Sequence, residues 1–191
     1  GMGEPFLNYQ NVIRSIRNLL KDFPNSRATI ATIGVLPKKI KELSYEKLSL
    51  TLKLHLSLHA PNDNLRKKIL PKAGKIHPSL EALKYFSATR KVPSKINYIL
   101  IKNLNDSRGH ALQLAKLLKL YPFIVKLTTL NPFAHLKPSG MEKFDLFEEI
   151  LHSYGIETCR FISTGTEIEA GCGQLRRHFY NKDGKSAPYK N

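Results

Sequence analysis

The chain has 191 residues, 41% of them hydrophobic, which is enough for one sizeable core and demands no second domain. Lysine and arginine number 31 against 15 for aspartate and glutamate, so the formal net charge is +16 at pH 7. Such an excess favours a polyanionic partner, with solubility as the simpler interpretation. Nucleic acid is preferred to a membrane surface because the basic residues are not gathered on one amphipathic helix.

Two further classes of protein are disfavoured by the sequence. No run of about 18 apolar residues and no signal-peptide pattern is present, so we expect a cytoplasmic protein with no membrane partner. The two cysteines, Cys159 and Cys172, do not suggest the disulfide framework of a small secreted domain.

The first part of the chain alternates helix and strand. Asn8 can cap a helix with apolar residues at helical spacing, and Pro24 would help to end it. The β-rich run Arg27–Gly34 predicts a buried strand, and Pro37 is well placed to begin a helix that reaches about Tyr45.

The clearest strand runs from Leu48 to Leu58. Leucine stands at every second position and polar residues fill the others, which is the period-two pattern of a strand. Because helices separate the strands, we expect parallel crossovers, so the polar face should line a barrel or cleft. Ser57 and His59 lie at its carboxyl end, where α/β barrels build their sites, and Ala60–Asp63 turns the chain.

The same alternation continues to the end of the globular part. The predicted elements are a short helix over Leu65–Leu70, a helix capped by Ser79, a strand over Ile96–Ile101, a helix capped by Asn105–Ser107, a strand over Phe123–Leu130, a helix over Met141–Ser153 and a strand over Glu157–Ser163. Repeated βα units of this kind predict an α/β fold. From Arg176 the chain is basic and polar with interspersed aromatic residues, which is typical of a disordered tail or of an arm that contacts RNA.

Four segments, taken together, are specific. They are GMGEPFLNY at the start, SLHAPND at 57–63, LNPF at 130–133 and EIEAGCGQL at 167–175. In this order and spacing they resemble the radical S-adenosylmethionine methyltransferases of the RlmN/Cfr type, which methylate an adenine of 23S ribosomal RNA. The resemblance implies an incomplete TIM-like barrel over residues 1–163, with parallel strands and outer helices, then a functional loop at 164–175 and a basic tail at 176–191.

The resemblance also implies a binding site for S-adenosylmethionine across the carboxyl ends of the strands. Gly3 and Glu4 match the contacts to the methionine amino group, and a carboxylate is a sensible partner for an ammonium. The other matching cofactor contacts are Ser57, Leu58, His59 and Asn131. Each of these residues also has a purely structural interpretation, as part of a turn or as the cap of a strand.

Cys172 matches the cysteine that carries the methyl group in the family. It stands between two glycines, and a thiolate is the strong nucleophile that methyl transfer from a sulfonium needs. In the family, a second cofactor molecule is cleaved at a 4Fe-4S cluster, and the resulting radical activates the cysteine-bound methyl for addition to the adenine. Cys159 matches no functional position and is assigned to the core.

The chain also departs from the family pattern. The cluster is held there by a Cys-x3-Cys-x2-Cys motif that precedes the GEP segment, and two cysteines cannot supply three thiolates, so no metal ligand is assigned here. Ala31 replaces a serine, Asn97 a glutamate and Thr164 an arginine, and Thr166-Glu167 replaces an acidic pair. We therefore expect either the carboxyl-terminal part of a normal enzyme or a naturally short, decayed relative that is inactive alone.

Two alternatives to a complete enzyme remain open. One is a non-catalytic module that binds RNA or ribosomes, and the other is one half of a split enzyme. Without preceding barrel strands, the strand at 27–34 would have an unpaired parallel edge, which predicts edge pairing or a homodimer.

Overall fold

The computed structural model describes residues 3–49, 51–131 and 136–162. Within these ranges, five strands form one sheet in the order β1-β2-β3-β4-β5, and every neighbouring pair is parallel. The strands are β1 (Arg27–Thr32), β2 (Thr51–Ser57), β3 (Lys95–Leu100), β4 (Ile124–Thr129) and β5 (Thr158–Phe161). The predicted parallel crossovers are therefore confirmed.

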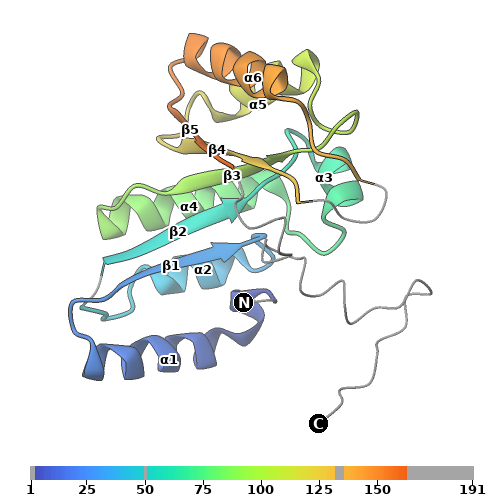
Figure 1. Cartoon of the computed structure of the whole chain (residues 1–191). Coiled ribbons are helices and arrows are strands. Elements are labelled where there is room, and N and C mark those ends of the chain that lie inside the picture. The colour runs from blue at the N-terminus through green and yellow to red at the C-terminus, as the bar shows by residue number, and fades with distance from the viewer. Residues whose placement is uncertain (1–2, 50, 132–135, 163–191) are drawn as a thin grey trace.

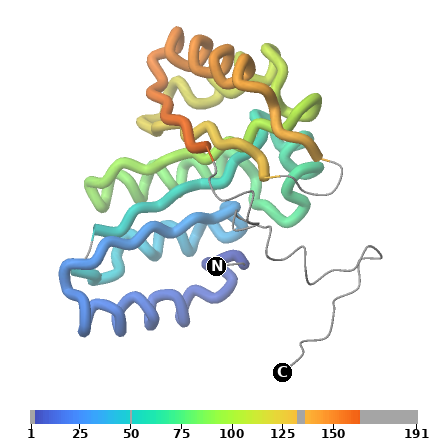
Figure 2. The backbone as a smooth tube through the Cα atoms, in the orientation of Figure 1, coloured from blue at the N-terminus to red at the C-terminus, as the bar shows by residue number. Residues whose placement is uncertain are grey.

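Helices cover one side of this sheet. The described helices are the short 3-10 helix η1 (Pro5–Asn8) and the α-helices α1 (Tyr9–Asp22), α2 (Pro37–Leu43), α3 (Asp63–Ile69), α4 (Ile76–Arg90), α5 (Arg108–Leu118) and α6 (Met141–Ser153), of which four form this covering layer. Figure 1 shows α2, α4, α5 and α6 on the outer side of a curved sheet, while no described helix lies on the inner side. Figure 2 shows that the strands follow one another across the curved sheet in chain order, from β1 to β5. The sheet curves but does not close among the described residues, so the strands form part of an open barrel.

The alternating sequence of β2 separates core from inner face. Leu52, Leu54 and Leu56 are fully buried against the helices, whereas Lys53 and His55 are only half-buried on the opposite side. The polar face of this strand thus looks into the open barrel, as the sequence predicts. None of the described helices is long and apolar enough to cross a bilayer.

Helix α4 begins earlier than the sequence suggested. Its first residue is Ile76, so the prediction that Ser79 caps this helix was wrong. The buried Ser79 hydroxyl lies instead 2.7 Å from the carbonyl oxygen of Lys75 and 3.1 Å from that of Gly34. Ser79 therefore connects the start of α4 to the loop after β1, and its polar side chain is satisfied without solvent.

The first strand has a free edge. Among the described residues β1 pairs only with β2, and its other edge faces α1 across a groove of about 800 Å³. Asn11 and Ser15 line the helical wall of this groove, and residues 28–31 line the strand wall. The unpaired edge is therefore present in the described part of the chain, whereas a strand or second copy bound to it stays a prediction.

Candidate functional site

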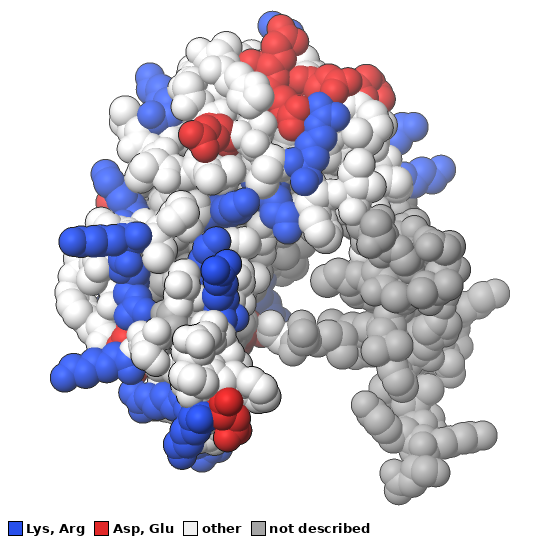
Figure 3. Space-filling view, turned by 60° about the vertical axis from the view of Figure 1, so that its left-hand side comes forward, with Lys and Arg blue, Asp and Glu red and all other residues white. Residues whose placement is uncertain are grey.

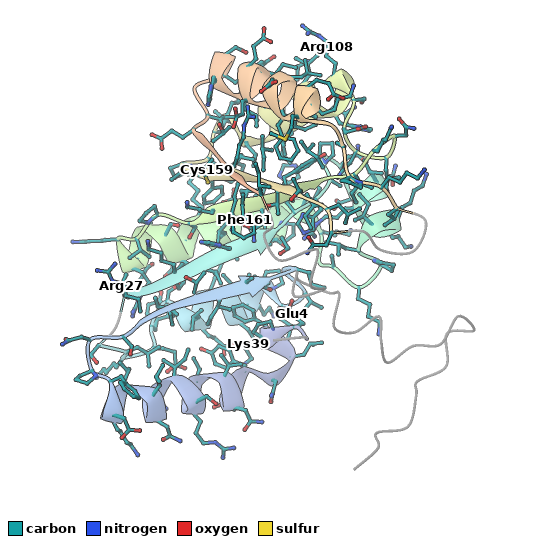
Figure 4. All side chains as sticks on the ribbon, in the orientation of Figure 1. Glu4, Arg27, Lys39, Arg108, Cys159 and Phe161 are labelled. Atoms are coloured by element: carbon teal, nitrogen blue, oxygen red, sulfur yellow. The ribbon has the colours of Figure 1, made fainter. Side chains whose placement is uncertain are left out.

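Glu4 is fixed at the carboxyl end of β1. One of its carboxylate oxygens accepts hydrogen bonds from the Thr32 hydroxyl at 2.5 Å and from the amide of Phe6 at 3.4 Å. The other accepts the amide of Ile33 at 2.9 Å. Figure 4 shows Glu4 just below the end of the β1 arrow. Gly3, directly before it, has φ +117°, a conformation that favours glycine, so the turn interpretation of Gly3 is also satisfied.

Arg66 holds the ends of the first two strands together, and sequence reasoning missed it. The residue is only 1% exposed, although it belongs to the short, strongly charged helix α3. Its guanidinium donates to the carbonyl oxygens of Ile33 and Ser57, both at 2.9 Å, and to that of Leu58 at 3.1 Å. It also donates to the carbonyl of Gly74. The planar fork of arginine suits such a set of divergent acceptors better than a lysine ammonium would.

Burial lowers the pKa of Arg66 to about 10, while the charge of Asp63 partly opposes this effect. The side chain therefore stays protonated near neutral pH. The four hydrogen bonds described above all go to carbonyl oxygens, so the charge is solvated by peptide dipoles in place of water. A positive group thus lies directly behind the ends of β1 and β2.

His59 is buried and held as a neutral ring. Its Nδ1 accepts the backbone N–H of Ile99 at 3.0 Å, so the proton of the neutral imidazole must be on Nε2. Burial lowers the pKa of His59 to about 4, and the charge of Arg66 adds to this shift. At neutral pH the ring therefore offers one N–H donor at Nε2 and no positive charge.

The backbone of His59 is also constrained. It adopts φ +55°, which is uncommon for a residue other than glycine. The buried Asn105 side chain donates to the carbonyl oxygens of His59 at 2.8 Å and Ile99 at 2.7 Å and accepts the amide of Ile101 at 2.7 Å. Asn105 is thus a positioning residue for this loop, whereas Ser107 alone caps α5 by accepting the amide of His110.

Asn97 on β3 places a buried side-chain oxygen near this edge. Asn97 is paired in register with Ser57, and its carbonyl oxygen accepts the amide of Leu58 at 3.0 Å. Its side-chain Oδ1 is buried and has no hydrogen-bond partner among the described residues. Such an atom is suited to accept a hydrogen bond from a bound ligand. Asn131 lies farther along the same edge, just after β4.

The structure therefore brings together most of the site residues that the sequence suggested. Glu4, Ser57, Leu58 and His59 gather at the carboxyl ends of β1 and β2 and are linked by Arg66. Cys172, the proposed methyl carrier, lies outside the described residues.

The residues of this chain fit one of the two implied cofactors. A fixed carboxylate, a buried amide oxygen and a neutral imidazole N–H match the ammonium and hydroxyl groups of S-adenosylmethionine. The 4Fe-4S cluster does not fit, because the 191 residues contain two cysteines and the family uses three. Cys159 lies on the inner face of β5, where the Lys95 ammonium is 3.5 Å from its sulfur.

Comparison with known proteins shows what the chain is related to, although no family model matches it. It is 40% identical over 193 residues to a probable dual-specificity RNA methyltransferase RlmN from Dictyoglomus thermophilum, an alignment that covers 97% of this chain and 55% of that protein. The dual-specificity RNA methyltransferase RlmN of Wigglesworthia glossinidia brevipalpis is 37% identical, with 97% and 50% covered. The chain is a homologue of RlmN-type radical SAM methyltransferases. It spans about half the length of these curated relatives.

Solved structures agree with this relationship. A radical SAM methyltransferase from Sphaerobacter thermophilus superposes with a TM-score of 0.82 at 35% identity, covering 91% of this chain and 52% of that one. A domain of a pyruvate-formate lyase-activating enzyme from Bacteroides vulgatus, at 16% identity and a TM-score of 0.66, shows the fold alone. The resemblance to the RlmN family and the partial TIM-like barrel are therefore confirmed.

Replacing Arg66 should lower the stability of the folded chain. We expect Arg66→Ala to lower the free energy of unfolding by at least about 3 kcal/mol, because several buried carbonyl oxygens lose their donors. Arg66→Lys should fall between this variant and the wild type. The exposed neighbour Lys67→Ala is the control and should change stability by less than about 0.5 kcal/mol in urea denaturation. Equal effects at positions 66 and 67 would contradict this role of Arg66.

The neutral state of His59 makes stability depend on pH. The folded pKa of about 4 lies below the ordinary value of 6.5, so the unfolded chain binds more protons between these values. Stability present above pH 6.5 is therefore lost as the pH falls towards 4, by up to about 3 kcal/mol. His59→Asn, which tolerates positive φ, should flatten this part of the unfolding profile relative to wild type. The slope that remains should come from other groups, such as His55, whose pKa burial also lowers to about 4. A slope unchanged by the substitution would contradict the contribution of His59.

Proposed function

We propose that this chain is the S-adenosylmethionine-binding part of an RNA methyltransferase of the RlmN type that acts on an adenine of 23S ribosomal RNA, in the cytoplasm. The observation that carries the proposal is the fixed Glu4 carboxylate at the end of β1, beside the loop Ser57–His59 that Arg66 holds. The identity to RlmN proteins over 97% of the chain supports it.

Each residue around this edge has a role that its geometry supports. Glu4 would accept the methionine ammonium on a carboxylate already oriented by Thr32 and the Ile33 amide. The Nε2–H of His59 would donate to the ligand, and the buried Oδ1 of Asn97 would accept from it. The remaining proposed contacts are Gly3, Ser57, Leu58 and Asn131.

S-adenosylmethionine supplies an electrophilic methyl group when it is bound. We assign the acceptor role to Cys172, in the segment 164–175 that lies in the sequence between the proposed barrel part, residues 1–163, and the basic segment 176–191. This assignment is supported by the EIEAGCGQL segment and by the nucleophilicity of a thiolate.

The radical part of the reaction needs more than these 191 residues, since their two cysteines, one of them assigned as the methyl acceptor, cannot supply the three thiolates that hold the cluster in the family. We propose that the cluster is held by a preceding segment of a longer protein or by a separate chain, and that these residues alone do not methylate RNA. A non-catalytic RNA-binding module is the second candidate. It is favoured by the charge of +16 and by Ala31 and Asn97, which replace family residues at the cofactor edge.

Cofactor affinity separates the two candidates. Isothermal titration of the chain with S-adenosylmethionine should show binding that weakens about 10- to 100-fold in Glu4→Ala, because a charge-assisted hydrogen bond is lost. Glu4→Gln tests the charge alone, and the exposed Glu149→Ala on α6 is the matched control. RNA binding without any cofactor affinity would instead support the non-catalytic module.

We also propose that the free edge of β1 accepts another parallel strand, either from a further barrel segment or from a second copy of the chain. In sedimentation across a concentration series, the chain should dimerise. Ala31→Lys should oppose this by placing a charge at the exposed edge, whereas Ala88→Lys on the exposed part of α4 adds the same charge elsewhere. A monomer at every concentration would contradict the homodimer.

A further inference from the structure

Three lysines converge on the inner face of the sheet. Lys53 on β2, Lys95 on β3 and Lys126 on β4 share this face, because His55 pairs with Lys95 and Asn97 with Lys126 in the strand registers. All three are half-buried. Figure 3 shows Lys and Arg side chains across the middle of the molecule, whereas acidic side chains gather at the top, over α6.

The described residues leave this positive charge without neutralisation. The five strands contain no aspartate or glutamate. Within the described ranges, Arg160 is the one strand residue that forms an ion pair, and it points away from this face to Asp145 and Glu148 of α6. None of the three inner lysines forms an ion pair with a residue of the described part of the chain.

The lysines lie close enough to act on the same neighbour. Burial first, and then the charges of Lys126, Lys95 and Lys53, lower the pKa of His55 to about 4. The histidine is therefore neutral and adds no further charge near neutral pH. Together with the strand registers, this shared neighbour places the three lysines around His55 on one face of the sheet.

An exposed aromatic ring stands beside this cluster. The Lys126 ammonium lies 3.9 Å from the centre of the Phe161 ring, and Phe161 is 47% exposed. Figure 4 shows Phe161 in front of the sheet, on the same side as Cys159. Ile162, which follows, is 56% exposed. Lysines on neighbouring strands next to an exposed aromatic ring are the combination with which proteins bind single-stranded nucleic acid.

We propose that this inner face binds single-stranded RNA, with phosphate groups on Lys53, Lys95 and Lys126 and a base stacked on Phe161. The inference rests on the proposed function, because it takes RNA as the substrate class, and it adds the surface that RNA would contact. An acidic protein segment is the other occupant that the charge would allow. The exposed Phe161 favours RNA, since carboxylates gain nothing from an aromatic platform.

The test uses the chain with a short fluorescein-labelled single-stranded RNA of mixed sequence and follows anisotropy over a salt series. The variant with Lys53→Gln, Lys95→Gln and Lys126→Gln should bind roughly 10-fold more weakly or worse, and the slope of log K against log salt should fall by about 2, since each phosphate contact contributes about 0.7. Phe161→Ala should weaken binding roughly 5- to 150-fold with little change of slope.

Matched controls separate a specific surface from net charge. Lys21→Gln, Lys116→Gln and Lys119→Gln together remove the same charge from exposed outer positions, and Leu120→Ala removes an exposed apolar side chain that is 76% accessible. Equal losses in the inner and outer lysine variants would overturn the proposal. Thermal unfolding verifies that the inner variant folds, and Lys126→Arg, which keeps the charge, should retain binding.

Two further measurements distinguish RNA from an acidic protein segment and the RNA surface from the cofactor site. Displacement of the RNA by polyglutamate at equal charge, together with no effect of Phe161→Ala, would assign the face to an acidic protein segment and overturn the proposal. S-adenosylmethionine titration is run on the same samples. Loss of RNA binding with unchanged cofactor affinity supports the RNA surface, and RNA binding that depends on the inner lysines supports it even if the chain has no cofactor affinity and the proposed function fails.

Discussion

The buried guanidinium of Arg66 is the interaction on which the rest of the edge depends. Parallel strands end in carbonyl groups that have lost their ladder partners, and such groups must find donors when they are buried. Arg66 supplies these donors to Ile33 on one side and to Ser57 and Leu58 on the other. The amide of Ile33 donates to Glu4, while its carbonyl oxygen accepts from Arg66. The Arg66 hydrogen bonds therefore position both the Glu4 carboxylate and the loop after β2. A second set of hydrogen bonds, from the Asn105 side chain to the carbonyl oxygens of His59 and Ile99, fixes His59 against β3.

The carboxyl edge of the sheet and its inner face differ in their charge. At the carboxyl edge, a carboxylate, a neutral imidazole and an amide oxygen form a mixed polar site suited to a small zwitterionic cofactor. Below it, the inner face carries lysines without carboxylates, around a neutral His55. Enclosing these ammonium groups without anions would be expensive, so whatever covers this face must bring negative charge. On the outer side, by contrast, part of the charge is paired locally, as Glu148 of α6 is with Arg160 of β5.

Much of the fold followed from the sequence because its signals are local. The leucine alternation of β2 fixes which side is core, and alternating helices and strands dictate parallel crossovers. The start of α4 was misplaced because Ser79 looks like a cap, whereas its hydroxyl binds the distant carbonyl of Gly34. Arg66 was missed for the same reason: in a run of charged residues nothing local marks the one that is buried. Glu4 was found only through motif resemblance, whereas His59 was also indicated by its place at the carboxyl end of the predicted strand. The residues that bind their side chains are contributed by other parts of the chain, so no local signal marked those contacts.

The central claim is that the carboxyl ends of β1 to β3 form one S-adenosylmethionine site. Two-dimensional ¹H–¹⁵N spectra recorded while S-adenosylmethionine is added test it most directly, because each backbone amide reports its own surroundings. If the cofactor binds at this edge, the amides of Ile33, His59 and Ile99, which bracket Glu4 and the His59 ring, should shift progressively. Spectra that do not change, or shifts confined to the outer surface of α4 and α5, would contradict it.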